Sequence, residues 1–265
     1  MKKLEDQAWS LCGDFHCGAP TGLTPDPRNK IQEVLLDRYK DALKWLGPVD
    51  KVLVNGDLID GRDPKSRDYD VEDMLDQAEQ AARLIVMQKP KDEVLITMGT
   101  RYHETLEAQG FHKHVEKCVR YWSLKELGRE IPVTFRRKLK TTINKWFLME
   151  ARHFQRSSSV FQGRSTASLR SMMWNVVNAA YNGGKWPDLL VFSHVHYWTR
   201  AENAWATAVT LPCFQALGGA FGDEVCDGHV DVGLARLTVG ATKETGWHLE
   251  RKLYPASAGT RTDSR

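Results

Sequence analysis

Five of the nine histidines in this chain fall in a fixed order with carboxylates, and most of these motifs directly follow apolar, β-like stretches. The motifs are G-D-F-H at 13–16, G-D-L-I-D-G at 56–61, Y-H-E at 102–104, a single histidine at 153 and S-H-V-H at 193–196. In open α/β sheets, the loops at the carboxyl ends of the strands form the ligand-binding sites. The pattern therefore favours a fold that brings several strand ends, far apart in sequence, to one place.

Hydrophobic periodicity predicts alternating strands and helices in the first half of the chain. Apolar runs predict strands at 8–12, 51–55 and 93–98, and apolar residues at helical spacing predict helices at 31–46, 71–87 and 111–127. Gly47 and Pro48 provide a stop signal for the first of these helices.

The second half of the chain is richer in strands. We expect strands at 133–143 and 145–150 around an Asn144-Lys145 turn, a helix at 165–181, a buried strand at 189–192, and strands of a second sheet at 204–211, 230–239 and 247–253. Because a purely parallel doubly wound sheet fits this half poorly, we predict an α/β fold, a mixed β-sheet sandwich flanked by helices.

The bulk composition indicates a soluble protein with one large domain. The chain has 265 residues, and we expect one domain over 1–254 and a disordered tail over 255–265, which is rich in Ser, Thr, Gly and Arg.

The net charge of +3 provides no strong field for capturing nucleic acid or a membrane. Five cysteines without a C-x-x-C pair favour a reducing compartment, and neither a signal peptide nor a membrane span is visible. We therefore expect a cytoplasmic location and no membrane partner.

The motif residues are those that a site for two metal ions requires. Two divalent ions about 3.5 to 4 Å apart cleave phosphoesters well, because they generate hydroxide near neutral pH and neutralise charge on the attacking and leaving oxygens. Such a site needs a bridging carboxylate and neutral imidazole ligands. Asp14 and His16 can converge on one ion if the backbone leaves the strand and turns at Gly18. His194 and His196 share a face in extended structure, so each can serve one ion of a pair.

The order and spacing of the motifs resemble those of the calcineurin-like metallophosphoesterase superfamily. The family motifs D-x-H, G-D-x-x-D, G-N-H-[ED], H and G-H-x-H have counterparts here from Asp14 to His196. This resemblance implies the family fold and a phosphodiesterase or phosphomonoesterase in which metal-bound hydroxide attacks phosphorus. It also implies a cofactor of two divalent ions, with manganese, iron, zinc and nickel left open.

The resemblance assigns a role to each matching residue. It would place Asp14, His16 and His196 on one ion and His153 and His194 on the other, with Asp57 bridging the two. It would make His103 the catalytic residue that protonates the leaving group or steadies the transition state. Asp60 matches the second carboxylate of G-D-x-x-D and is expected to orient a ligand.

The chain departs from the family pattern at the G-N-H motif, where the segment at 99–104 reads G-T-R-Y-H-E. Either Thr100 or Tyr102 takes the position of the family's metal-binding Asn. Because a hydroxyl is a weaker neutral ligand than an amide carbonyl, we expect the second ion to bind less tightly or to keep an extra water. The segment resembles G-T-x-x-H variants of bacteriophage and related bacterial members. Ser193 replaces the Gly of G-H-x-H, and this change restricts only the local backbone.

Two arginines near the motifs, Arg101 and Arg164, are candidates for binding the substrate phosphate, because a guanidinium matches phosphate with two parallel hydrogen bonds. The expected partner is thus a phosphoester. Nucleic acid stays open, because a DNA or RNA exonuclease or endonuclease of the same superfamily is an alternative reading. A catalytically impaired binding protein is a second alternative, and the oligomeric state is not fixed by the sequence.

Overall fold

The computed structural model describes residues 5–61, 70–71, 73–100, 103, 111–156, 163–217 and 230–254. Its four helices are α1 (Lys30–Leu46), α2 (Met74–Met87), α3 (Phe111–Leu127) and α4 (Thr166–Asn182). The strands are β1 (Gln7–Cys12), β2 (Lys51–Asn55), β3 (Glu93–Thr97), β4 (Val133–Arg136), β5 (Leu139–Ile143), β6 (Phe147–Ala151), β7 (Leu189–Phe192), β8 (Thr199–Glu202), β9 (Thr207–Thr210), β10 (Val232–Val239) and β11 (Trp247–Tyr254).

The strands form two mixed sheets. The first has the order β11-β10-β1-β2-β3-β4, and the second has the order β5-β6-β7-β9-β8. In the first sheet, β1 to β4 are parallel, and β10 pairs antiparallel to β1 with Gln7 opposite Val239. In the second sheet, β6, β7 and β9 are parallel, so both sheets have a central parallel part with carboxyl ends that can carry a site.

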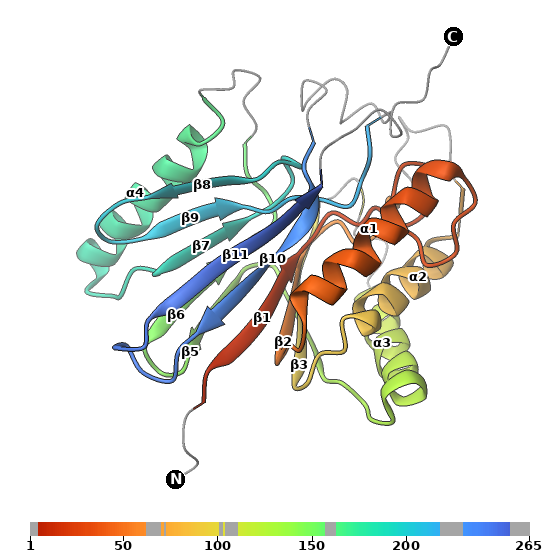
Figure 1. Cartoon of the computed structure of the whole chain (residues 1–265). Coiled ribbons are helices and arrows are strands. Elements are labelled where there is room, and N and C mark those ends of the chain that lie inside the picture. Colours follow the sequence, from red (N-terminus) through yellow and green to blue (C-terminus); the bar gives the residue numbers. More distant parts are fainter. Residues whose placement is uncertain are drawn as a thin grey trace.

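Four layers result, with the two sheets face to face and the helices outside them (Figure 1). Side chains alternate along β2 accordingly: Val52 and Val54 pack in the core beneath the helices, whereas Leu53 packs between the sheets. Helices α1, α2 and α3 cover the first sheet, and α4 covers the second through Met172, which packs on Leu190 and Phe192. The predicted fold class, a mixed β-sheet sandwich flanked by helices, is confirmed.

Two predictions about individual strands are wrong. The stretch 133–143 is not one strand but β4 and β5, which lie in different sheets. The strands predicted at 230–239 and 247–253 exist, but as β10 and β11 they extend the first sheet beyond β1 rather than belonging to the second. Strand β8 was not predicted, because its T-R-A-E sequence has no apolar run.

Some expectations concern residues outside the described part of the chain, namely the tail at 255–265, Arg101 and Tyr102. Within the described part, no helix is long and apolar enough to cross a membrane. The four described cysteines, Cys12, Cys17, Cys118 and Cys213, form no disulfide.

Asn144, in the turn between β5 and β6, links the two sheets at the end opposite to the strand carboxyl ends of the first sheet. It adopts a left-handed backbone with φ of 48°, which Asn tolerates better than most residues. Its Nδ2 lies 3.0 to 3.1 Å from the carbonyl oxygens of Glu5, Val239 and Gly240, and its Oδ1 accepts from Gln7. One side chain therefore holds the turn of the second sheet against the ends of β1 and β10.

We expect Asn144→Ala to lower the free energy of unfolding by about 1 to 3 kcal/mol, because partly buried carbonyls lose their donor. Urea denaturation measures this change. The matched control is Asn182→Ala, whose exposed side chain donates to the Asn178 carbonyl on its own helix. Equal stability of the two variants would contradict the role given to Asn144.

Candidate metal centre

The motif loops are aligned because strand pairing continues past the ends of β1 and β2. Asp14 donates its main-chain N–H to Gly56 over 3.0 Å, and His16 donates to Asp57 over 3.1 Å. Beyond them, Cys17 and Ile59 form a further parallel bridge. In the second sheet, Ser193 donates to the His153 carbonyl over 2.9 Å, which aligns the loops after β6 and β7 in the same way.

Most candidate ligands adopt a backbone conformation that ordinary residues avoid. Among the described residues, eight other than glycine have positive φ, and five of these are candidate ligands: Asp14, His16, Asp57, His194 and His196. Each such residue costs of order 1 to 3 kcal/mol, and strain of this kind clusters at functional sites. The chain leaves each strand through a sharp turn that points the next side chain at a common centre.

The side chains converge in three overlapping groups, within each of which the potential ligand atoms all lie within 4.8 Å of one another. The groups are Asp14 with His16 and His196, Asp57 with His153 and His194, and Asp57 with His16 and His103. The first two are the sets that the family resemblance implies for the two ions. Asp57 belongs to two groups, which is the position that a bridging carboxylate must occupy.

Hydrogen bonds to the outer ring nitrogens orient two of the imidazoles. Nδ1 of His16 lies 3.2 Å from Asp60 Oδ1, and Nδ1 of His153 lies 2.7 Å from the carbonyl oxygen of Asn55. Because these acceptors hold a proton on Nδ1, each Nε2 is the nitrogen available to a ligand. Nε2 of His153 then lies 2.9 Å from Asp57 Oδ2, a contact that requires a proton or a metal ion between the two atoms.

The electrostatics of the cluster show where positive charge is needed. Burial alone would raise the pKa of the carboxyls, but the imidazoles, His153 foremost, hold the pKa of Asp14 below its ordinary value and that of Asp57 well below it. Burial alone would lower the pKa of His153, but Asp57 and Asp14 raise it to about 10. Burial and the charge on His153 lower the pKa of His194 to about 4.

The donor set fits divalent transition-metal ions. Oδ1 of Asp14 is buried, and its near neighbours among the described residues include Nε2 of His196 at 3.3 Å. His16 Nε2 and His196 Nε2 face each other at 3.3 Å. Clustered imidazole nitrogens and carboxylate oxygens suit zinc, manganese, iron or nickel, and the outer hydrogen bonds from Asp60 and Asn55 are of the kind that orient metal ligands.

Thr100 and His103 lie at the edge of this cluster. The Thr100 main-chain N–H donates to Asp57 Oδ1 over 2.7 Å, and its hydroxyl lies 3.3 Å from the same oxygen. In this geometry Thr100 orients the Asp57 carboxylate. His103 Nδ1 donates to the main-chain carbonyl of Asp60 over 2.7 Å, which leaves its Nε2 for another partner.

Asn55 is a residue of the site that the sequence reasoning missed. Its Nδ2 donates to Ser193 Oγ over 2.9 Å and to the Arg152 carbonyl over 3.2 Å, and its Oδ1 accepts from Thr97 Oγ1 over 2.7 Å. With its carbonyl holding His153, Asn55 connects the ends of β2, β3, β6 and β7. The available signal was a polar residue at the end of an otherwise apolar strand, directly before G-D.

The structure places the other predicted residues less centrally. Arg164 is only 9% exposed and lies over the Tyr197 ring at 4.7 Å, beside the loop that carries His196. Cys17 adjoins His16 but is not a predicted ligand; it is in none of the three groups, and burial raises the pKa of its thiol.

The comparisons with known proteins concern the fold. No protein-family model and no curated protein matches the chain. Among solved structures, Vps29 of Entamoeba histolytica in complex with Zn²⁺ is 15% identical, with a TM-score of 0.43 and coverage of 93% of this chain and 98% of that one. A predicted phosphoesterase from Streptococcus pneumoniae is 11% identical, with a TM-score of 0.41 and 94% of each chain covered. An archaeal phosphodiesterase is 9% identical, with a TM-score of 0.43 and coverage of 92% and 99%.

These likenesses are too distant to argue for a site or an activity. Any site or activity must therefore be inferred from the residues of this chain. The two mixed sheets have the helices on their outer faces, and the motif residues come together at the strand ends. A mixed β-sheet sandwich flanked by helices thus carries a donor cluster at its strand ends, formed by the residues for which the resemblance of the motifs implies metal binding.

We expect Asn55→Ala to lower metal affinity by about 10- to 100-fold, because ligands on three strand ends lose a common support. Calorimetric titration with Mn²⁺ measures this effect on protein that circular dichroism shows to be folded. Thr97→Val is the matched control, since it removes one hydrogen bond of the same network without touching a ligand loop. A variant of Asn55 with unchanged affinity would refute this positioning role.

The pKa of His153 predicts that metal binding expels a proton. In metal-free protein, a pKa of about 10 keeps His153 protonated at neutral pH, and an ion must displace that proton to reach Nε2. The affinity for Zn²⁺ or Mn²⁺ should therefore rise between about pH 6 and pH 9, approaching tenfold per pH unit for one displaced proton. Titrations in buffers of different ionisation enthalpy count the protons released.

The control for this titration is His248→Gln, because His248 is exposed on β11, far from the cluster in sequence and sheet position. It should release as many protons as the unmodified protein. Affinity that stays constant over the whole pH range would contradict the arrangement described for His153.

Proposed function

We propose that the protein is a metal-dependent phosphoesterase that uses two divalent ions to hydrolyse a phosphodiester or phosphomonoester. The observation that carries the proposal is the position of Asp57, which belongs to two of the three donor groups and lies 2.9 Å from His153. A single structural ion would need about four ligands, whereas the cluster contains six candidate ligands from both sheets, Asp57 included. Bound divalent ions supply a nucleophile at neutral pH and neutralise phosphate charge.

The surrounding residues have separate roles in this proposal. Asp57, oriented by Thr100, holds the two halves of the site at a fixed separation. Asp60 orients His16 through its carboxylate and His103 through its main-chain carbonyl. Burial alone would lower the pKa of His103, but Asp57 and Asp60 raise it above its ordinary value. His103 can therefore keep a proton near neutral pH and donate it to the departing oxygen.

A catalytically impaired binding protein is the competing function, and the loss of the family Asn at the Thr100 position favours it. Against it, the remaining ligands and His103 are all brought together at the strand ends. Screening mono- and diesters with added Mn²⁺ separates the two, since an impaired protein would bind metal without turnover.

We expect the protein to hold up to two divalent ions per chain and to hydrolyse bis-nitrophenyl phosphate only when metal is present. Asp60→Asn should lower activity by about 10- to 100-fold through His16, and Asp57→Asn should lower it more, because it weakens both ions together. Elemental analysis and initial rates measure the two effects. Equal losses in both variants would mean that Asp57 does not bridge.

We expect His103→Ala to keep both ions but to slow turnover by about 10²- to 10⁴-fold, the range for losing a positioned acid. The loss should be smaller for nitrophenyl esters than for alkyl esters, because nitrophenolate departs without a proton. His112→Ala is the control, since this histidine lies on α3 outside the cluster. Loss of metal from His103→Ala, together with no effect of the leaving group, would show that His103 is a ligand.

A further inference from the structure

Helix α4 carries an exposed apolar face on the outer side of the second sheet (Figure 1). This α4 face consists of six large side chains, each between 37% and 87% exposed: Leu169, Met173, Trp174, Val177, Tyr181 and Trp205. Four of them recur every fourth residue and so lie on one side of the helix, with Trp174 bordering them. Trp205 joins them from the turn between β8 and β9, because Asn203, which accepts the Trp205 N–H, lies 3.9 Å from the Met173 sulfur.

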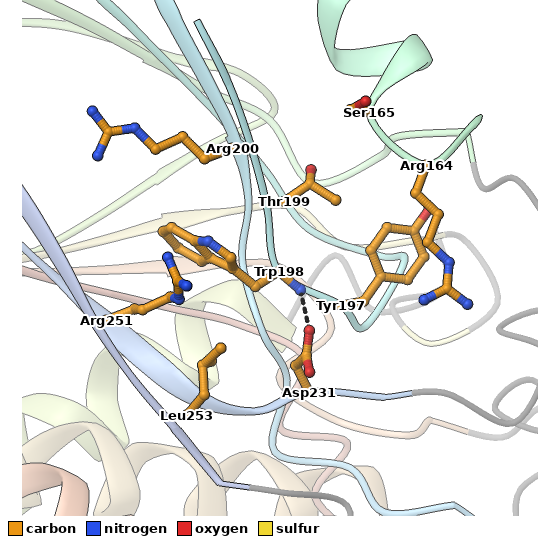
Figure 2. A pocket seen from close by; sticks show the side chains of 9 residues that line it. All are labelled: Arg164, Ser165, Tyr197, Trp198, Thr199, Arg200, Asp231, Arg251 and Leu253. Carbon is orange, nitrogen blue, oxygen red and sulfur yellow. Dashed lines mark hydrogen bonds between the residues drawn. The ribbon is translucent and has the colours of Figure 1, made fainter. Parts of the chain in front are cut away.

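The opposite side of α4 is held firmly on the body of the protein. Met172 is buried between the helix and the second sheet. Directly before the helix, the Arg164 guanidinium lies over the Tyr197 ring at 4.7 Å (Figure 2). In the first turn, Ser168 Oγ accepts from Gln155 over 3.2 Å. The helix therefore cannot turn its exposed apolar side inward without losing these contacts.

The α4 face is nearly free of charge, unlike the exposed apolar side chains of α3. Helix α4 has one charged residue among its 17, Arg170. On α3, Tyr121 and Leu124 are exposed as well, but the same helix carries six Lys, Arg and Glu residues. Single apolar side chains among charges are ordinary on a protein surface, whereas a contiguous apolar face marks an interaction site.

The area of the α4 face is that of a protein interface. Large aromatic side chains bury about 150 to 250 Å² each, so Trp174, Tyr181 and Trp205 alone expose about 300 to 500 Å². With its three aliphatic side chains added, the face approaches the roughly 800 Å² that each partner contributes to a standard interface. A partner with a similarly large and uncharged surface is needed to cover it.

The charges of α4 favour a second copy of this chain as that partner. Among the described residues, Arg170 has no carboxylate partner. The last turn of α4 has no basic residue, so the partial negative charge at that end of the helix is uncompensated. The nearest lysine beyond it, Lys185, is held by Asp188 over 2.9 Å. Two α4 helices packed antiparallel would bring the Arg170 of each to the carboxyl end of the other.

We infer that the α4 face is a two-fold dimer interface in which α4 packs antiparallel on α4 of a second copy. With the axis between positions 175 and 176, Arg170 lies level with Tyr181 of the partner subunit, whose ring can accept the guanidinium. The two Arg170 side chains are then about 16 Å apart along the helices, beyond the range of strong repulsion at physiological salt. This inference concerns the assembly of the protein and does not depend on the proposed function.

Sedimentation equilibrium of the full chain tests the dimer. We expect about twice the chain mass of 30.2 kDa at about 20 μM protein, because interfaces of standard size have a Kd of about 1 μM or lower. Trp174→Ser should raise the Kd at least about 10-fold, the effect of losing a central aromatic side chain. Tyr121→Ser is the matched control, because it removes an equally exposed aromatic side chain from α3. A monomer at this concentration, or a dimer that only Tyr121→Ser weakens, would overturn the inference.

An exchange of charges tests the antiparallel pairing. Arg170→Glu should raise the Kd about 10-fold, because a carboxylate then lies at the negative end of the partner helix, twice in each dimer. Adding Tyr181→Lys to Arg170→Glu should restore most of the affinity, since opposite charges are then level with each other. Both side chains are exposed, so circular dichroism should show all variants folded. A double variant that dimerises no better than Arg170→Glu alone would overturn the antiparallel pairing.

Discussion

Two buried carboxylates, Asp14 and Asp57, set the main electrostatic constraint on this molecule. Both are at most 1% exposed, and a buried carboxylate is stable only where positive charge compensates it. In the protein alone, part of that charge is a proton on His153, whose pKa the two carboxylates raise to about 10. Divalent ions would provide the same compensation with more charge, which is why the cluster favours metal binding over an ordinary ion pair.

The cluster requires a strained backbone at the strand ends, and contacts between the two sheets hold these ends in place. Left-handed backbone at five candidate ligands costs free energy that the packed sheets must offset. Gly56 shows how closely the parts approach, because a Cβ there would lie 2.4 Å from His153 Nδ1. Asn55 connects both sheets just behind the ligands. The site therefore depends on contacts between the sheets, and not on any single loop.

The sequence predicted what depends on local pattern and missed what depends on distant pairing. Strand β2 and helix α3 were predicted to the residue, since apolar periodicity is local. The places of β10 and β11 beside β1 were not, because antiparallel pairing between residues 7 and 239 leaves no local trace. The motifs identified the ligand candidates, but the role of Asn55 depends on hydrogen bonds across the two sheets, which composition cannot show.

The central claim is that Asp57 lies between two metal ions held by residues of both sheets. Anomalous scattering from crystals grown with Mn²⁺ tests it most directly. The account predicts two peaks about 3.5 to 4 Å apart, both in contact with Asp57, one beside His16 and His196 and the other beside His153 and His194. A single peak, or peaks that Asp57 does not share, would contradict it.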